Sequence, residues 1–142
     1  MSEVGEALAS LADRFGLAEI YAFGSRAGEL AARARGQQGV PTRPDSDADL
    51  GVRRIVGRAF DPEERVCLTI ALEDLFGATR VDLVVLSEAP PFLALEIVSG
   101  ELLYCRDGVA QAEYELYVLR RAGDLAPFER ERRRMILRGE AR

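Results

Sequence analysis

Short apolar strands alternate with amphipathic helices along the whole chain, and this alternation constrains the possible folds most. The spacing of apolar residues predicts helices over 3–15, 26–35, 62–76, 92–98, 109–122 and 127–138, and strands over 18–23, 46–53, 80–86 and 101–105. Capping signals support two of the helices, because Ser2 precedes the first and Asp61 precedes the third. The order predicts an α/β (α+β) fold, in which flanking helices cover a small mixed β-sheet.

The chain has the length of one domain. Its 142 residues lie within the usual domain size of roughly 100–150 residues. Residues 36–45 hold two glycines and two prolines and predict a loop, but this loop is too short to separate two domains. We therefore expect residues 1–142 to form a single domain, with 109–138 as C-terminal helices.

Missing residue types exclude several kinds of active site. The chain has no histidine and no lysine, so all 19 basic residues are arginine. Without histidine there is no Ser-His-Asp triad and no HExxH zinc site. Without lysine there is no Walker A loop and no Schiff base. Carboxylates are therefore the leading candidates for proton transfer and metal binding.

Charge and hydropathy limit the binding partners and the cellular compartments that suit the chain. A net charge of -5 argues against direct nucleic-acid binding, and no apolar run approaches the ~20 residues that span a membrane. The N-terminus lacks a secretion signal, so we expect a cytoplasmic protein. Cys67 and Cys105 lie far apart in apolar stretches and are expected to be buried, reduced thiols rather than a disulfide.

Three aspartates are the candidate metal ligands. Asp47 and Asp49 lie two residues apart, on one face of the strand predicted over 46–53, and could grip a common hard cation. Asp82 is the one charged residue within the apolar core of the strand over 80–86, and it would supply a third carboxylate for Mg²⁺. The alternatives are a solvated strand end for the first two, and a salt bridge to Arg53 or Arg80 for Asp82.

A glycine and a serine follow the first strand, where a helix begins. Gly24 would let a phosphate approach the backbone, and Ser25 would add a hydroxyl. Arg26 is a possible charge clamp. The alternative is an ordinary turn with a helix cap. Phosphate bound at a helix start, beside a metal held by acids, is typical of phosphoryl or nucleotidyl transfer.

The segments Gly24–Ala27, Ser46–Leu50 and Val81–Leu83 resemble the signature of the DNA polymerase beta-type nucleotidyltransferase superfamily. Within it, the chain is similar to minimal nucleotidyltransferases (MNT), the antitoxin partners of HEPN ribonuclease toxins. Here the stretch between Ala27 and Asp47 is longer than in the small relatives. We interpret this as one or two added helical turns and a longer loop.

The resemblance implies specific roles for the candidate residues. Gly24, Ser25 and Arg26 would bind ATP, and Asp47 and Asp49 would bind Mg²⁺. Asp82 would serve as a third ligand or as the base for the attacking hydroxyl. The reaction implied is transfer of AMP to a tyrosine hydroxyl of a cognate HEPN toxin. The chain would form either a hetero-oligomer with this toxin or a homo-oligomer. The alternatives are an inactive antitoxin that masks its partner sterically and a transferase that acts on a small molecule.

The predicted helix over 109–122 carries two apolar stripes. One consists of Val109, Ala112, Leu116 and Leu119, and the other consists of Tyr114, Tyr117 and Val118. One stripe would suffice for the core, so we expect the tyrosine stripe to form a partner surface together with the arginine-rich residues up to 138. The alternative is that the last helix buries the second stripe.

Overall fold

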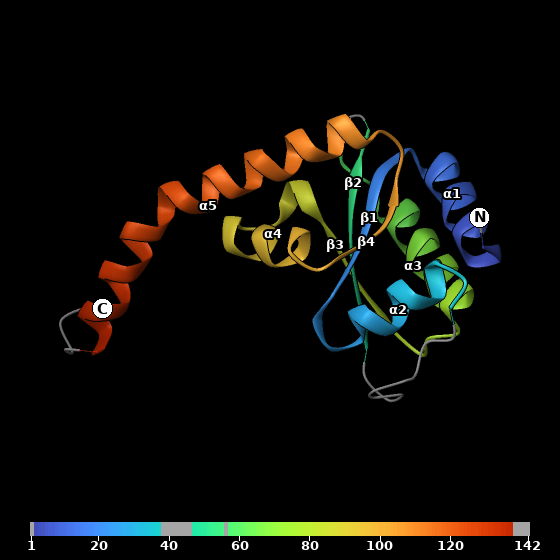
Figure 1. The fold of residues 1–142 in the computed structure, drawn as a ribbon, viewed down its shortest axis with the longest axis horizontal. Helices are drawn as coiled ribbons and strands as arrows, with labels where there is room; N and C mark the ends of the chain where they lie inside the picture. The colour runs from blue at the N-terminus through green and yellow to red at the C-terminus, as the bar shows by residue number, and fades with distance from the viewer. Residues whose placement is uncertain (1, 38–46, 56, 138–142) are drawn as a thin grey trace.

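The computed structural model describes residues 2–37, 47–55 and 57–137. Its centre is one mixed sheet in the strand order β3-β2-β1-β4 (Figure 1). The strands are β1 (Leu17–Phe23), β2 (Ala48–Arg54), β3 (Val81–Val85) and β4 (Glu101–Cys105). β1 is antiparallel to both β2 and β4, whereas β2 and β3 are parallel. The predicted small mixed sheet is confirmed.

Five α-helices surround the sheet within the described residues, and two of them begin at predicted caps. They are α1 (Glu3–Phe15), α2 (Ala27–Ala34), α3 (Pro62–Phe76), α4 (Pro91–Val98) and α5 (Gly108–Leu137), with short 3-10 turns η1 (Gly24–Arg26) and η2 (Leu86–Glu88). The Ser2 hydroxyl accepts a hydrogen bond from the Gly5 amide at the start of α1. Asp61 and Glu64 form a complete capping box at the start of α3. These caps confirm the two predicted helix starts.

Helices cover both faces of the sheet. α1, α2 and α3 enclose the main core on one face, where Ala48, Leu50 and Val52 of β2 are fully buried. α4 and the first half of α5 cover the other face, which carries Tyr21 and Phe23 of β1 (Figure 1). The remaining side chains of β2 therefore point toward α4 and α5. Asp49, Gly51 and Arg53 lie on this second face because side chains alternate along a strand.

Gly51 sets how closely α4 approaches β2. A Cβ atom at this position would lie 2.5 Å from Cγ2 of Ile97, a distance that real Cβ contacts essentially never show. The glycine therefore lets Ile97 pack directly onto the strand, only two residues from Asp49. The short helix α4 is thereby held close to the candidate site.

The C-terminal region differs from the prediction of two helices. α5 is one continuous helix of 30 residues, which includes both Gly123 and Pro127. Glycine and proline cost about 1 and about 3 kcal/mol in a helix interior, but the surrounding Leu-, Glu- and Arg-rich turns favour helix and continue it across both residues. α5 starts beside the sheet, and its C-terminal half extends away from the body (Figure 1).

Cys67 and Cys105 are both free thiols, as predicted, but the expected burial is wrong, because Cys67 is exposed and Cys105 is only partly buried. None of the helices within 2–37, 47–55 and 57–137 is long and apolar enough to span a membrane. Residues 38–45 of the predicted loop lie outside the described ranges.

Candidate active site

Asp49 and Asp82 are direct neighbours across two parallel strands. They are paired in the register of β2 and β3, so their Cα atoms are separated by about one strand spacing, roughly 4.8 Å, and their side chains share one face. Asp47 lies two residues before Asp49 on the same side of the chain. The structure thus brings together the three predicted carboxylates, here called the carboxylate cluster (Asp47, Asp49 and Asp82).

The carboxylates affect each other electrostatically. The pKa of Asp49 is raised, first by burial and then by the negative charges of Asp82, Asp47 and Glu96. Like charges this close favour protonation, because each carboxylate disfavours the ionised form of its neighbours. A bound cation would relieve this repulsion. The cluster therefore has the charge and the oxygen ligands that suit a hard divalent cation.

Arg80 already interacts with two members of the cluster. Its Nε atom lies 3.6 Å from Oδ2 of Asp47 and 3.5 Å from Oδ1 of Asp82. The salt bridge that was the alternative for Asp82 therefore exists, and it is made by Arg80. Arg53 instead binds the fully buried Glu19 through two hydrogen bonds, of 2.7 and 2.6 Å.

The cluster is an open site rather than a closed metal cage. Among the residues that the structure describes, no three His, Cys, Asp or Glu side chains are arranged to hold a metal ion by themselves. The structure therefore brings the three predicted metal ligands together, but does not arrange all three around one ion position.

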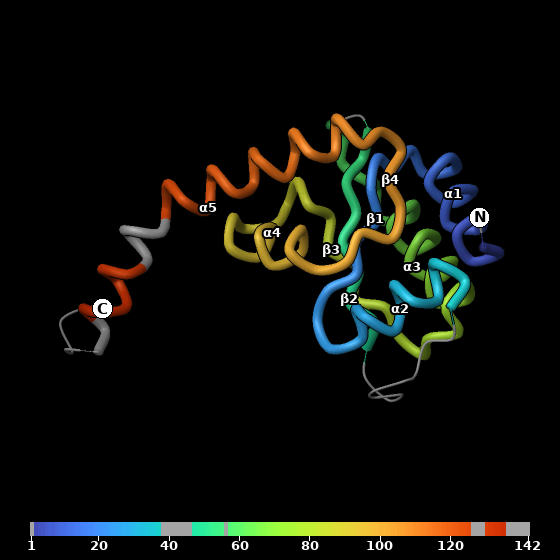
Figure 2. The backbone as a smooth tube through the Cα atoms, viewed as in Figure 1, coloured from blue at the N-terminus to red at the C-terminus, as the bar shows by residue number. Residues whose placement is uncertain are grey.

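Gly24 lies against the cluster. It follows Phe23, which pairs with Asp49 in the register of β1 and β2. A Cβ atom at Gly24 would lie 2.5 Å from Oδ2 of Asp49, and the glycine has a φ of 75°, in the left-handed region. Both features require glycine here. Figure 2 shows the backbone leaving β1 in a wide turn before α2, and in this turn Ser25 is exposed.

Arg26 is buried, whereas Gly24 and Ser25 are exposed. Its side chain is only 6% exposed, and its Nε and Nη2 atoms donate hydrogen bonds of 3.0 and 2.9 Å to the two carboxylate oxygens of the buried Glu29. This pair raises the pKa of Arg26 and lowers that of Glu29. The structure thus brings Gly24 and Ser25 to the site but ties the Arg26 guanidinium to the first turns of α2.

Glu96 was not among the predicted site residues. It is exposed on α4, next to Ile97, and its charge contributes to the raised pKa of Asp49. No motif marks this residue. Its place near Asp49 follows from the contact between Gly51 and Ile97, which holds α4 against β2. This contact cannot be read from the sequence.

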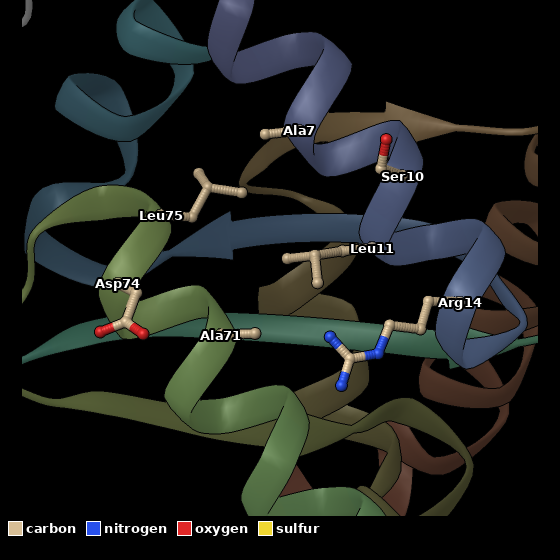
Figure 3. Close-up of a pocket in the computed structure, with 7 residues that line it drawn as sticks. All are labelled: Ala7, Ser10, Leu11, Arg14, Ala71, Asp74 and Leu75. Atoms are coloured by element: carbon tan, nitrogen blue, oxygen red, sulfur yellow. The ribbon is translucent and has the colours of Figure 1, made fainter.

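A separate hollow of about 560 Å³ lies between α1 and α3 (Figure 3). Leu11 and Ala71 form its middle, while Arg14 and Asp74 lie toward opposite ends. These helices cover the face of the sheet opposite to the carboxylate cluster. The hollow holds a single carboxylate and is therefore not the candidate active site.

Comparisons with known proteins agree with this geometry. Residues 6–108 match the family model described as "Polymerase beta, Nucleotidyltransferase". No curated protein sequence matched the chain. Several solved structures share the fold. One is a toxin-antitoxin with AMP-PNP, with 23% identity, a TM-score of 0.65, and coverage of 96% of this chain and 98% of that one.

Two further structures are similar over nearly their full lengths. One is the toxin-antitoxin MntA-HepT, with 20% identity, a TM-score of 0.64 and 97% coverage of both chains. The other is a tri-AMPylated Shewanella oneidensis HEPN toxin in complex with MNT antitoxin, with 23% identity, a TM-score of 0.62 and 97% coverage of both chains. At these identities the likeness establishes the fold, which is the nucleotidyltransferase fold that the sequence predicted.

Proposed function

Because the chain belongs to the polymerase beta nucleotidyltransferase family, we propose that it transfers AMP from ATP to a tyrosine hydroxyl of a cognate HEPN toxin. The observation that carries this proposal is the carboxylate cluster beside Gly24. The similar structures support the choice of nucleotide and acceptor, since their descriptions name AMP-PNP and an AMPylated HEPN toxin. The free thiols of Cys67 and Cys105 are compatible with work in the cytoplasm.

The metal would be held by the carboxylate cluster. Enzymes of this family generally use a divalent metal ion. The pKa of Asp49 is raised mainly by burial and further by the negative charges of Asp82, Asp47 and Glu96, and a bound ion would offset this second part. The hard oxygen ligands favour Mg²⁺. When bound, the ion would stabilise negative charge on the phosphate oxygens.

The remaining residues position the reactants. Gly24 leaves room for a phosphate to approach the backbone beside Asp49, and the exposed Ser25 hydroxyl can donate a hydrogen bond to a phosphate oxygen. The tyrosine oxygen forms a bond to the α-phosphorus, the bond from that phosphorus to the oxygen bridging to the β-phosphate breaks, and pyrophosphate leaves. Asp82 is the candidate acceptor for the proton of the tyrosine hydroxyl.

Arg26 has a supporting role in this proposal. Its hydrogen bonds to Glu29 join η1 to α2 and fix the turn that carries Gly24 and Ser25. A role in direct nucleotide binding stays a prediction, because it would require the guanidinium to leave a buried carboxylate. Breaking such a buried pair on one side is costly.

The toxin would bind α5. At 1.5 Å per residue, a helix of 30 residues is about 45 Å long, and its C-terminal half projects from the body. Val109, Ala112, Leu116 and Leu119 form an exposed apolar stripe, here called the outer stripe. The expectation for the tyrosine stripe is wrong for Tyr114 and Val118, which pack against the core, whereas Tyr117 is exposed as expected. The similar toxin-antitoxin structures cover 96% and 97% of this chain.

A second candidate is an antitoxin that masks its partner without turnover. The observation in its favour is that Arg80 pairs with both Asp47 and Asp82, which partly satisfies the cluster without a metal. In this case the outer stripe would carry the whole activity, and the aspartates would be dispensable for protection.

A transfer assay tests the proposal. The purified protein, ATP labelled in the α-phosphate, Mg²⁺ and a HEPN-type toxin encoded beside it should yield labelled toxin. Asp47→Ala and Asp49→Ala should each abolish labelling, whereas Asp13→Ala, which removes an exposed carboxylate paired with Arg106, should not. Lack of transfer from all four nucleotides would contradict the proposal. If the Asp47→Ala, Asp49→Ala double variant still binds the toxin and protects cells, steric masking is the better explanation.

A further inference from the structure

Arg80 has a fixed backbone and a freely accessible side chain. Its carbonyl oxygen accepts a 3.0 Å hydrogen bond from the Ala48 amide, which anchors it between the starts of β2 and β3. Its side chain is nevertheless 69% exposed. The guanidinium therefore sits over the carboxylate cluster without being packed into it.

The two ion pairs of Arg80 are of a kind that breaks easily. Both Nε to oxygen distances, 3.6 and 3.5 Å, are longer than those of a good charge-assisted hydrogen bond. Exposed ion pairs of this type are usually worth between about 0 and 1 kcal/mol. A divalent cation brings twice the charge to the same two carboxylates. It would therefore displace the guanidinium at little cost.

A displaced Arg80 would still be within reach of a bound nucleotide. Its side chain is long, its root lies beside Asp47 and Asp82, and a guanidinium donates paired hydrogen bonds to phosphate oxygens. Arg26, by contrast, is buried and already bonded to Glu29. Of these two arginines, Arg80 is the one whose exposed side chain could serve as a charge clamp.

We propose that Arg80 is a positioning residue that takes the place of the cation between Asp47 and Asp82, and then moves to the nucleotide phosphates when the cation enters. The inference rests on the proposed function, because it assigns the cation and the triphosphate to this site. It implies that a divalent ion binds weakly alone and tightly together with nucleotide, since only the phosphates provide Arg80 with a new partner.

Binding measurements on the full chain test this idea without any turnover. Mn²⁺ is titrated alone and with a non-hydrolysable ATP analogue, and free Mn²⁺ is followed by electron paramagnetic resonance. We expect Arg80→Ala to bind Mn²⁺ alone about fivefold more tightly, because a competing cation is gone. The same variant should bind the Mn²⁺-nucleotide complex at least about fivefold more weakly, because a phosphate ligand is gone. Arg80→Lys keeps the positive charge, so both of its affinities should lie between those of the wild-type protein and those of Arg80→Ala.

Arg58→Ala is the matched control. Arg58 is 73% exposed, pairs with Glu64, and follows the opposite end of β2, so its removal changes the net charge equally without touching the cluster. A structural defect would weaken both affinities of Arg80→Ala together, and that result would overturn the inference. Equal affinities in Arg80→Ala and Arg58→Ala would overturn it as well.

The failure of this inference is distinguishable from failure of the proposed function. If the wild-type protein binds the Mn²⁺-nucleotide complex and Arg80→Ala shows no opposite shifts, only the role of Arg80 is wrong. If the wild-type protein binds neither Mn²⁺ nor the complex, the metal site is wrong, and the inference falls with it.

Discussion

The Arg53 guanidinium lies 4.6 Å from the centre of the Tyr114 ring while its nitrogens bind the buried Glu19. This contact ties α5 to the sheet, because Glu19 belongs to β1 and Arg53 to β2. Burial raises the pKa of the Tyr114 hydroxyl, in keeping with a side chain that faces inward. Tyr117, one helical turn later, is exposed.

The two tyrosines should therefore respond differently to truncation. Tyr114→Ala removes a half-buried aromatic ring and its contact with Arg53, and is expected to lower the free energy of unfolding by about 2–4 kcal/mol. Tyr117→Ala should change it by less than about 1 kcal/mol. Urea unfolding of both variants measures the difference. Equal destabilisation by the two changes would show that the helix is seated differently.

The outer stripe should determine affinity for the toxin. Leu116→Ser with Leu119→Ser is expected to weaken binding by a few kcal/mol at most, through loss of apolar contact area, while leaving the melting temperature nearly unchanged. Isothermal titration with the toxin measures this. Val66→Ser with Ile70→Ser is the control, because these α3 side chains are exposed to a similar extent. If the α3 pair weakens binding instead, the toxin docks on α3.

Gly24 and Gly28 provide a matched pair of substitutions. Gly24→Ala forces a left-handed φ on alanine and places its Cβ against Asp49, so we expect a loss of about 1–2 kcal/mol in stability together with a loss of nucleotide binding. Gly28 lies inside α2, and a Cβ atom there would meet nothing within 4 Å, so Gly28→Ala should stabilise the protein by about 0.5–1 kcal/mol. Thermal melting and nucleotide titration test both. Unimpaired nucleotide binding by Gly24→Ala would argue against a phosphate site there.

Stability should fall in alkaline solution because of Tyr21. Burial, partly offset by the hydrogen bond from Gln111, raises the pKa of this hydroxyl from 10.0 to about 12. The unfolded chain releases the tyrosine proton at lower pH than the folded protein does. The contribution of Tyr21 to the free energy of unfolding is therefore complete below pH 10 and is lost as pH rises toward about 12. Urea unfolding between pH 8 and pH 11 should show this decline, and Tyr21→Phe should reduce its slope. An unchanged slope in that variant would rule out Tyr21 as the source.

Local signals predicted much of the fold. The Ser2 cap and the Asp61–Glu64 capping box act within one helical turn, so the sequence alone determines them. The pairing of Asp49 with Asp82 was also predictable, because neighbouring strands place carboxylates of the same face together. The continuity of α5 was not, because the costs of Gly123 and Pro127 depend on the turns around them.

Other features of the site depend on contacts between distant segments. The approach of Glu96 to Asp49 follows from how α4 packs on Gly51, and the Arg80 ion pairs follow from the register of two strands. The prediction that the tyrosine stripe of α5 faces a partner was wrong for Tyr114 and Val118 for the same reason. Both stripes are apolar, and the stacking of Arg53 on Tyr114 fixes which one faces inward.

The family model ends at residue 108, and α5 begins at residue 108. The carboxylate cluster and Gly24 all lie before this point, so the candidate active site and α5 occupy consecutive stretches of the chain. Within α5, only inward residues such as Tyr114 and Val118 are bound by the needs of the core. The outer stripe lies outside the core, so under the proposed function a designer would retarget the enzyme to another acceptor protein by rewriting this one side of a single helix.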